Sequence, residues 1–177
     1  MLGRAVIILT ALALVAAAPA QAKELAFTAN LSGDKAPTNT GSKATGSAQI
    51  LLDTDHQTVD MTLDVKGLKI ADLWNQLMLA PVGPIHLHKY GSRDRSDPNS
   101  SSLAMPVPFG LDYVATGDGF RVVVKNYPYA RGAATVKSDL SFADFVTSLE
   151  NGEIVLNIHT NAKTDGEISG EVVPAKS

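Results

Sequence analysis

The sequence predicts a mainly β protein, an antiparallel β-sandwich or barrel with one short α-helix near residues 138–151. Three observations lead to this prediction. Apolar and polar residues alternate along seven segments, as in strands that bury one face. Short turns containing Asp, Asn and Gly separate several of these segments, and such turns join antiparallel neighbours. One segment departs from this pattern and has the apolar spacing of an amphipathic helix.

The seven expected strands follow from the alternation alone. They are residues 24–33, 45–53, 58–68, 84–91, 119–127, 153–160 and 166–173. The turn DTDHQ joins the second and third of these segments, and NAKTDG joins the last two. Both turns are short enough for a hairpin, so we expect antiparallel pairing on either side of each.

The expected helix is defined by four apolar residues with i, i+3, i+4, i+7 spacing. These residues are Phe142, Phe145, Val146 and Leu149. Ser138 or Ser141 can cap the start of this helix, and Asn151 with Gly152 can end it. We expect it to lie across one end of the sheet.

Three further segments are less regular. Residues 69–83, which contain Trp74, are compatible with a helical turn or with an insertion. Residues 92–102 are polar and contain a proline, which indicates a loop. The run from Tyr127 to Tyr129 fits either an exposed aromatic rim for a ligand or a packing corner at a strand end.

Residues 1–22 have the features of a secretory signal peptide. Arg4 precedes an apolar run that ends near Ala18, and Ala20-Gln21-Ala22 forms a cleavage signal of small residues. The run is shorter than the roughly 20 residues of a membrane-spanning helix, and no second run follows. We expect a periplasmic or secreted protein without membrane insertion after cleavage, in which residues 23–177 form a single domain.

The charge of the chain bears on its possible partners, and its cysteine content bears on the source of its stability. The chain has 15 basic and 18 acidic residues, a net charge of −3, and no run of four basic residues. Nucleic acid is therefore not an expected partner. The chain has no cysteine, so its stability depends on an apolar core rather than on disulfides.

Three of the four histidines occupy expected strands. His86 and His88 in GPIHLHKYG are one residue apart, so they share one strand face. His159 alternates with Ile158. If the last hairpin packs near the His86 strand, the three imidazoles converge, and such a set suits copper or zinc. Glu167 is the expected carboxylate partner for the second nitrogen of these rings, and the alternative is that it caps turn amides at the end of the hairpin.

Several of these blocks, in this order, resemble the CHRD domain, named after chordin and found in many exported bacterial proteins. They include FTANLSG, the hairpin ATGSAQILLDTDHQTVDMTLDVKGL, PIHLHKYG, and NGEIVLNIHTNAKTDGEISGEV. The resemblance covers about residues 25–173 and implies an antiparallel β-sandwich or barrel, immunoglobulin-like or superoxide dismutase-like. Chordin binds extracellular growth factors, so the resemblance also implies a binding module with an extracellular or periplasmic protein as a candidate partner.

The histidine spacing is also similar to that of Cu,Zn superoxide dismutase. HLHKYG stands where that enzyme has paired copper ligands, and VLNIHTNAKTDG where it has a later one. That enzyme needs further histidines, an aspartate and a disulfide. This chain offers only His56, in a tight turn, and no cysteine.

Three functional hypotheses follow. The first is a binding module that holds copper or zinc through His86, His88 and His159. The second is a copper-only superoxide dismutase-like oxidoreductase that uses the same residues. The third is a structural or adhesion module in which these histidines form a hydrogen-bond network. We favour a binding module over an enzyme, because no hydrolase, nucleotide-binding or zinc-protease motif is present.

Export is the first testable prediction. Because the cleavage signal ends at Ala22, we expect Lys23 to be the mature N-terminus and the protein to be recovered from the periplasm or the medium. N-terminal sequencing of the recovered protein measures this. An uncleaved, membrane-embedded product would contradict the prediction.

Overall fold

The computed structural model describes residues 23–35, 37, 39–91, 95 and 100–176, and within them nine strands form one antiparallel sheet. The expected signal peptide lies outside the described residues. The strands are β1 (Glu24–Ser32), β2 (Thr45–Asp53), β3 (Thr58–Lys66), β4 (Ile85–Lys89), β5 (Ser102–Val107), β6 (Tyr113–Ala115), β7 (Gly119–Pro128), β8 (Ile154–Ile158) and β9 (Ile168–Pro174). Their order in the sheet is β5-β4-β8-β9-β1-β2-β3-β7-β6. The predicted mainly β, antiparallel fold is confirmed.

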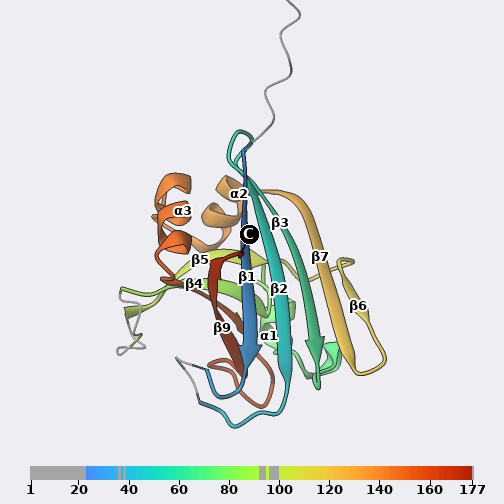
Figure 1. Ribbon diagram of the computed structural model, residues 1–177. Helices are drawn as coiled ribbons and strands as arrows, with labels where there is room; N and C mark the ends of the chain where they lie inside the picture. Colours follow the sequence, from blue (N-terminus) through green and yellow to red (C-terminus); the bar gives the residue numbers. More distant parts are fainter. Residues whose placement is uncertain (1–22, 36, 38, 92–94, 96–99, 177) are drawn as a thin grey trace, which may run out of the picture.

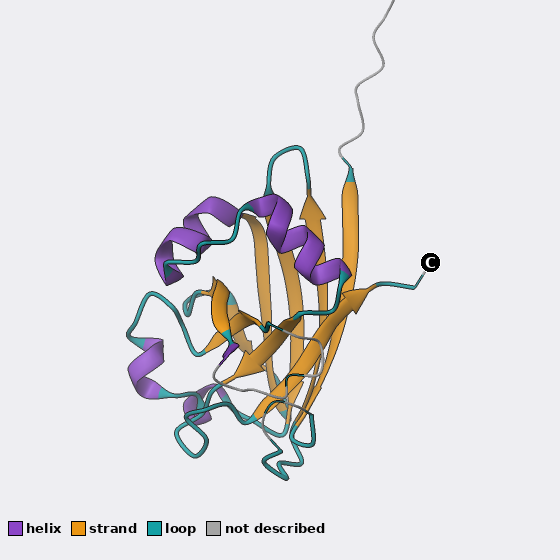
Figure 2. Ribbon diagram, turned by 90° about the vertical axis from the view of Figure 1, so that its left-hand side faces the viewer, coloured by secondary structure: helices purple, strands orange, loops and turns teal. Residues whose placement is uncertain are grey.

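The sheet curls into a half-barrel around the apolar core. The long strands β1, β2, β3 and β7 run side by side, β9 lies beside β1, and β4 and β5 run across them (Figure 1). Two helices, α2 (Tyr129–Val136) and α3 (Phe142–Glu150), lie together at one end of the sheet (Figure 2). The candidate site lies on the part of the sheet formed by β4 and β8.

Alternation along the long strands produces the core. In β3, Met61 and Leu63 are buried, whereas their sequence neighbours are only partly buried. Met61 pairs with Ile50 of β2, which is also fully buried. Each strand therefore contributes one apolar face to the interior of the half-barrel, and its other face lies toward the outside.

Strand β8 differs from the long strands because both of its faces are buried. Leu156 and Ile158 belong to the core cluster, as expected for the inner face. Val155 is 0 % exposed but does not belong to that cluster, and Asn157 is also buried. A second, smaller buried layer therefore covers the outer face of β8.

Helix α3 confirms the predicted helix near residues 138–151. Ser141 is the N-cap, and its side-chain oxygen accepts a hydrogen bond from the backbone N–H of Asp144 at 3.1 Å. Gly152 follows the helix with φ of +69°, a left-handed conformation that glycine adopts without strain. Phe145 and Leu149 are fully buried, so the helix closes one end of the core.

Helix α2 corrects the expectation of a single helix. It begins at Tyr129, where a strand-end corner or a ligand rim was considered. Tyr129 is buried, its hydroxyl donates to the carbonyl of Leu140 at 2.9 Å, and its ring stacks on Phe145 at 4.8 Å. Tyr129 therefore forms a packing corner. The helix was missed because the other buried residues of its inner face, Gly132 and Ala133, are small.

Four further elements lie outside the seven expected strands. Strands β5 and β6 occupy the two edges of the sheet. Residues 69–83 contain η1 (Ile70–Asp72) and α1 (Asn75–Met78), so this segment is helical over two short stretches.

Within the described residues, no helix has the length and apolar character needed to cross a membrane.

The buried position of Phe145 leads to a stability prediction. We expect Phe145→Ala to lower the free energy of unfolding by about 3–5 kcal/mol, because it leaves a cavity between α3 and the core. Urea unfolding measures the change. Glu150→Ala, at an exposed position of the same helix, serves as the control and should change stability by less than about 0.5 kcal/mol. A loss below about 1 kcal/mol for Phe145→Ala would contradict this packing.

Candidate metal centre

His86, His88 and His159 form one cluster, as predicted. Each offers one ring nitrogen, and these three atoms lie within 4.8 Å of one another. The ring centroids of His86 and His159 are 4.4 Å apart and stacked, and those of His86 and His88 are 4.9 Å apart. His86 is 4 % exposed and His159 is 7 % exposed, whereas His88 is partly buried.

The pairing of β4 with β8 brings the three rings together. His86 is opposite Asn157 and His88 is opposite Val155, so all four side chains lie on the outer face of the sheet. His159 directly follows β8, and its backbone N–H donates to the carbonyl of Pro84 at 2.9 Å. This bond continues the ladder by one residue, so His159 lies on the same face as Asn157 and next to His86.

Backbone carbonyls set the tautomers of two rings. Nδ1 of His159 lies 2.7 Å from the carbonyl oxygen of Thr164, and Nδ1 of His86 lies 3.2 Å from that of Gly83. A carbonyl oxygen only accepts hydrogen bonds, so Nδ1 carries the hydrogen in both rings. Nε2 of each ring is then left with a lone pair, which is the form that binds a metal.

Two ring nitrogens have no hydrogen-bond partner. Nε2 of His88 and Nε2 of His159 are both buried and unpaired. A hydrogen-bond network between side chains would satisfy these atoms, because an unpaired buried polar group costs about 1–3 kcal/mol. Nε2 of His159 therefore keeps a lone pair in the buried cluster without a protein donor, and Nε2 of His88 is buried beside it without a partner of either kind.

The spacing of the nitrogens is close to that of a metal site. Imidazole nitrogens bound to zinc at 2.0–2.1 Å lie about 3.3 Å apart when the coordination is tetrahedral. The separation of up to 4.8 Å in the cluster is larger, so small rotations of the rings would bring the nitrogens to the ligand distance. The three histidines could therefore hold one metal ion.

The three imidazoles are neutral at physiological pH. Burial, together with the nearby His159 and His88, lowers the pKa of His86 to about 2. Burial also lowers the pKa of His88 to about 4, and it lowers the pKa of His159. His86 and His88 are thus in the protonation state of metal ligands well below pH 6.5, where an exposed histidine would already be protonated.

Glu167 has a different contact from the one expected. Its carboxylate accepts hydrogen bonds from the hydroxyls of Ser42 at 2.8 Å and Thr160 at 2.6 Å. The Nδ1 atoms of His86 and His159 contact backbone carbonyls instead of this carboxylate. Glu167 therefore holds the loop after β8, which places the carbonyl of Thr164 against the ring of His159.

Two glycines allow the backbone to approach the cluster. Gly83 has φ of +71°, and a Cβ there would lie 2.5 Å from the carbonyl oxygen of Val107. Gly166 has φ of +116°, and a Cβ there would lie 2.3 Å from Oδ1 of Asn157. A larger residue at either position would displace the chain that supports His86 or Asn157.

Trp74 was not predicted as a site residue, yet it lies beside the cluster. Its backbone N–H donates to the carbonyl of His159 at 3.1 Å, and its ring centroid is 6.5 Å from that of His159. Asn161 reinforces this contact by donating from Nδ2 to the carbonyl of Leu73 at 3.0 Å. The signal in the sequence is that Trp74 is the one tryptophan of the chain, in a segment without clear strand pattern.

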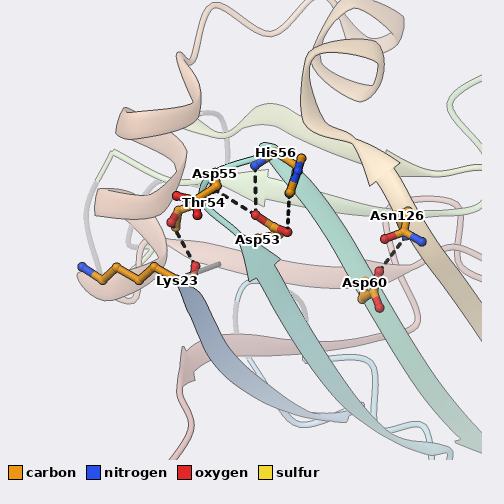
Figure 3. Close-up of polar contacts among 7 residues, drawn as sticks. All are labelled: Lys23, Asp53, Thr54, Asp55, His56, Asp60 and Asn126. Carbon is orange, nitrogen blue, oxygen red and sulfur yellow. Dashed lines mark hydrogen bonds and ion pairs between the residues drawn. The ribbon is translucent and has the colours of Figure 1, made fainter. Parts of the chain in front are cut away.

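His56 is separate from the cluster, as its position in a tight turn predicted. It lies in the turn between β2 and β3, and its Nδ1 contacts the carboxylate of Asp53 at 2.8 Å (Figure 3). Its side chain is 75 % exposed. The hydrogen bond with Asp53 raises the pKa of His56, opposite to the shift in the cluster.

Comparison with known proteins gave one family. The family model described as CHRD domain matches residues 27–172, which is most of the chain. No curated protein and no solved structure matched.

The lowered pKa values predict that acid destabilises the protein. Between pH 6.5 and pH 5 the unfolded chain binds more protons at these histidines than the folded chain does, so the free energy of unfolding falls as the pH falls. His86, with a folded pKa of about 2, contributes about 1.5 kcal/mol of this loss. Urea unfolding at pH 6.5, 6.0, 5.5 and 5.0 measures it.

The control for this prediction compares how steeply the free energy of unfolding depends on pH in two histidine variants. His86→Leu should give a shallower dependence on pH, because one buried ring has been removed. His56→Ala should not make the dependence on pH shallower, because the pKa of His56 is raised in the folded state whereas that of His86 is lowered. A flat profile for the wild type over this range would show that the three rings protonate as freely in the folded state as in the unfolded chain.

Proposed function

This chain belongs to the CHRD domain family, and on that premise we propose that it is an exported binding module that holds one transition-metal ion, copper or zinc. The ligands are the Nε2 atoms of His86, His88 and His159. The family supports a binding module, and the histidine cluster supplies the candidate ligands for the metal.

One observation carries this proposal. The cluster buries Nε2 of His88 and of His159 without any hydrogen-bond partner. A purely structural role for these rings would leave that cost uncompensated, whereas a metal ion accepts the lone pairs of all three rings. Neutral rings also bind a metal without first losing protons near neutral pH.

The charges around the cluster favour binding over oxidoreductase catalysis. Lys89 forms an ion pair with Glu153 at 3.3 Å, and Arg95 forms one with Glu171 at 3.1 Å. A superoxide dismutase gains from unpaired positive charge that attracts its anionic substrate. These two basic side chains, which lie nearest in sequence to His88 among those described, are already paired with carboxylates.

We place the protein in the periplasm or outside the cell. The signal peptide expected over residues 1–22 supports export, and the absence of a membrane-spanning helix among the described residues agrees with release after cleavage. An extracellular or periplasmic protein is then the expected macromolecular partner.

Titration calorimetry of the purified protein with Cu(II) and with Zn(II) tests the metal site. We expect one ion per chain, and a loss of affinity of roughly 100-fold or more in His86→Ala, His88→Ala and His159→Ala, since weaker outer-shell changes already cost 10–100-fold. His56→Ala is the matched control and should bind as the wild type does. Circular dichroism confirms that each variant is folded.

Two outcomes separate the competing functions. If neither ion binds the wild type, or if all four variants bind equally, the metal site is wrong and the structural module remains. If the copper-loaded protein dismutates superoxide in the presence of excess EDTA, which silences free copper, the oxidoreductase replaces the binding module. We expect binding without dismutation.

A further inference from the structure

The donor set of the cluster carries no negative charge. Within the described part of the chain, the group of histidine and carboxylate side chains that could share one ion contains only the three imidazoles. Glu167 is bound to the hydroxyls of Ser42 and Thr160. Glu171 is paired with Arg95. An ion in this cluster would therefore have no carboxylate ligand, and among the described side chains only the charge of Asp165 acts on His159 from outside the group.

Apart from Asn157 opposite His86 and the carbonyls that bond Nδ1, the side chains paired with His86 and His88 on the neighbouring strands are apolar. Pro106 is opposite His86 in β5, and Leu103 and Val155 are opposite His88 on its two neighbouring strands. Pro106 and Val155 are buried. The cost of transferring an ion into such a site rises with the square of its charge, so a divalent ion is penalised about four times as strongly as a monovalent ion of the same size.

Trp74 adds an aromatic ring to this surface. Two backbone contacts hold the residue beside His159: Leu73 pairs with Thr160 in an isolated β-bridge, and the N–H of Trp74 bonds to the carbonyl of His159. The centroid of the indole ring lies 6.5 Å from that of the His159 ring. The face of an indole ring attracts cations, and this attraction strengthens where water is excluded. Trp74 therefore adds to the binding of a weakly hydrated cation without adding a charged ligand.

We infer that the cluster selects a monovalent, soft metal ion, Cu(I), over Zn(II) and Cu(II), with Trp74 lying against the bound ion. This inference rests on the proposed function, because it names the ion that the three-histidine site takes. Three neutral nitrogen donors satisfy the low coordination number of Cu(I), whereas Zn(II) takes a fourth ligand, and no further histidine or carboxylate among the described residues belongs to the group.

Competition with chelators under anaerobic, reducing conditions tests the selectivity. Cu(I) is measured against bathocuproine disulfonate, and Zn(II) and Cu(II) are measured against chelators of known affinity. Ag(I) serves as a redox-stable analogue of Cu(I). We expect one Cu(I) or Ag(I) per chain, with affinity for Cu(I) at least about 100-fold above that for Zn(II), and a change in the fluorescence of Trp74 on addition of Ag(I).

The outcomes distinguish the two proposals. If Zn(II) or Cu(II) binds as tightly as Cu(I), the selectivity inference is overturned and the metal-binding module stands. If no ion binds, both the metal-binding module and the selectivity for Cu(I) are wrong. If Cu(I) binds tightly but His159→Ala does not change the affinity for Cu(I), the ion binds at another site and both proposals are wrong.

A matched pair of variants isolates the role of charge. Leu103 is partly buried on edge strand β5 opposite His88, so Leu103→Glu adds a carboxylate beside the cluster and Leu103→Gln adds a similar side chain without charge. We expect Leu103→Glu to raise the affinity for Zn(II) relative to Cu(I) by at least about tenfold over Leu103→Gln. Equal selectivity in the two variants would overturn the charge argument.

A second pair of variants tests whether the ring of Trp74 contributes to the binding of the ion. Trp74→Leu should weaken Ag(I) and Cu(I) binding by about threefold or more and leave Zn(II) binding unchanged, and Trp74→Phe should restore part of the loss. A merely structural role would instead change the affinities for all ions together. Equal binding of Ag(I) by Trp74→Leu and the wild type would remove Trp74 from the site.

Discussion

The pairing of β4 with β8 is the constraint on which the rest of this site depends. The ladder places Ile85 and Leu87 on the core side, opposite Ile158 and Leu156. It thereby forces the alternating residues, His86 among them, onto the outer face. A shift of one residue would turn the imidazoles into the apolar core and turn the aliphatic side chains onto the outer face among polar groups. The burial of the aliphatic residues therefore fixes the orientation of the histidines.

The outer face of this ladder is unusual because it is buried as well. An ordinary antiparallel sheet leaves its outer face in water, as β2 and β3 do here. Around His86 and His159 water is largely excluded, and the rings lose their hydration. Burial lowers their pKa values and leaves Nε2 of His159 without a hydrogen-bond partner. This lowers the stability of the folded state, and a bound cation would offset the loss.

The chain after β8 organises the site from one side. Thr160 bonds to the carboxylate of Glu167 and bridges to Leu73, while the carbonyl of Thr164 binds the ring of His159. The same turn therefore closes the hairpin, orients one imidazole and anchors the segment that carries Trp74. A local turn motif is coupled in this way to a segment about 85 positions earlier in the chain.

Period and spacing in the sequence determined seven of the nine described strands, helix α3 and the shared face of His86 and His88, because these depend on residues a few positions apart. They did not determine the edge strands β5 and β6. They did not determine α2, whose small inner residue Gly132 packs within a few ångströms of Met105, nor the position of Trp74. The meeting of His159 with the other two rings was conditional on which strands pair. Only the tertiary structure decided that pairing, the tautomers set by the carbonyls of Gly83 and Thr164, and the burial that keeps the rings neutral. These features arise from contacts between distant segments, and a local pattern carries no information about which segments meet.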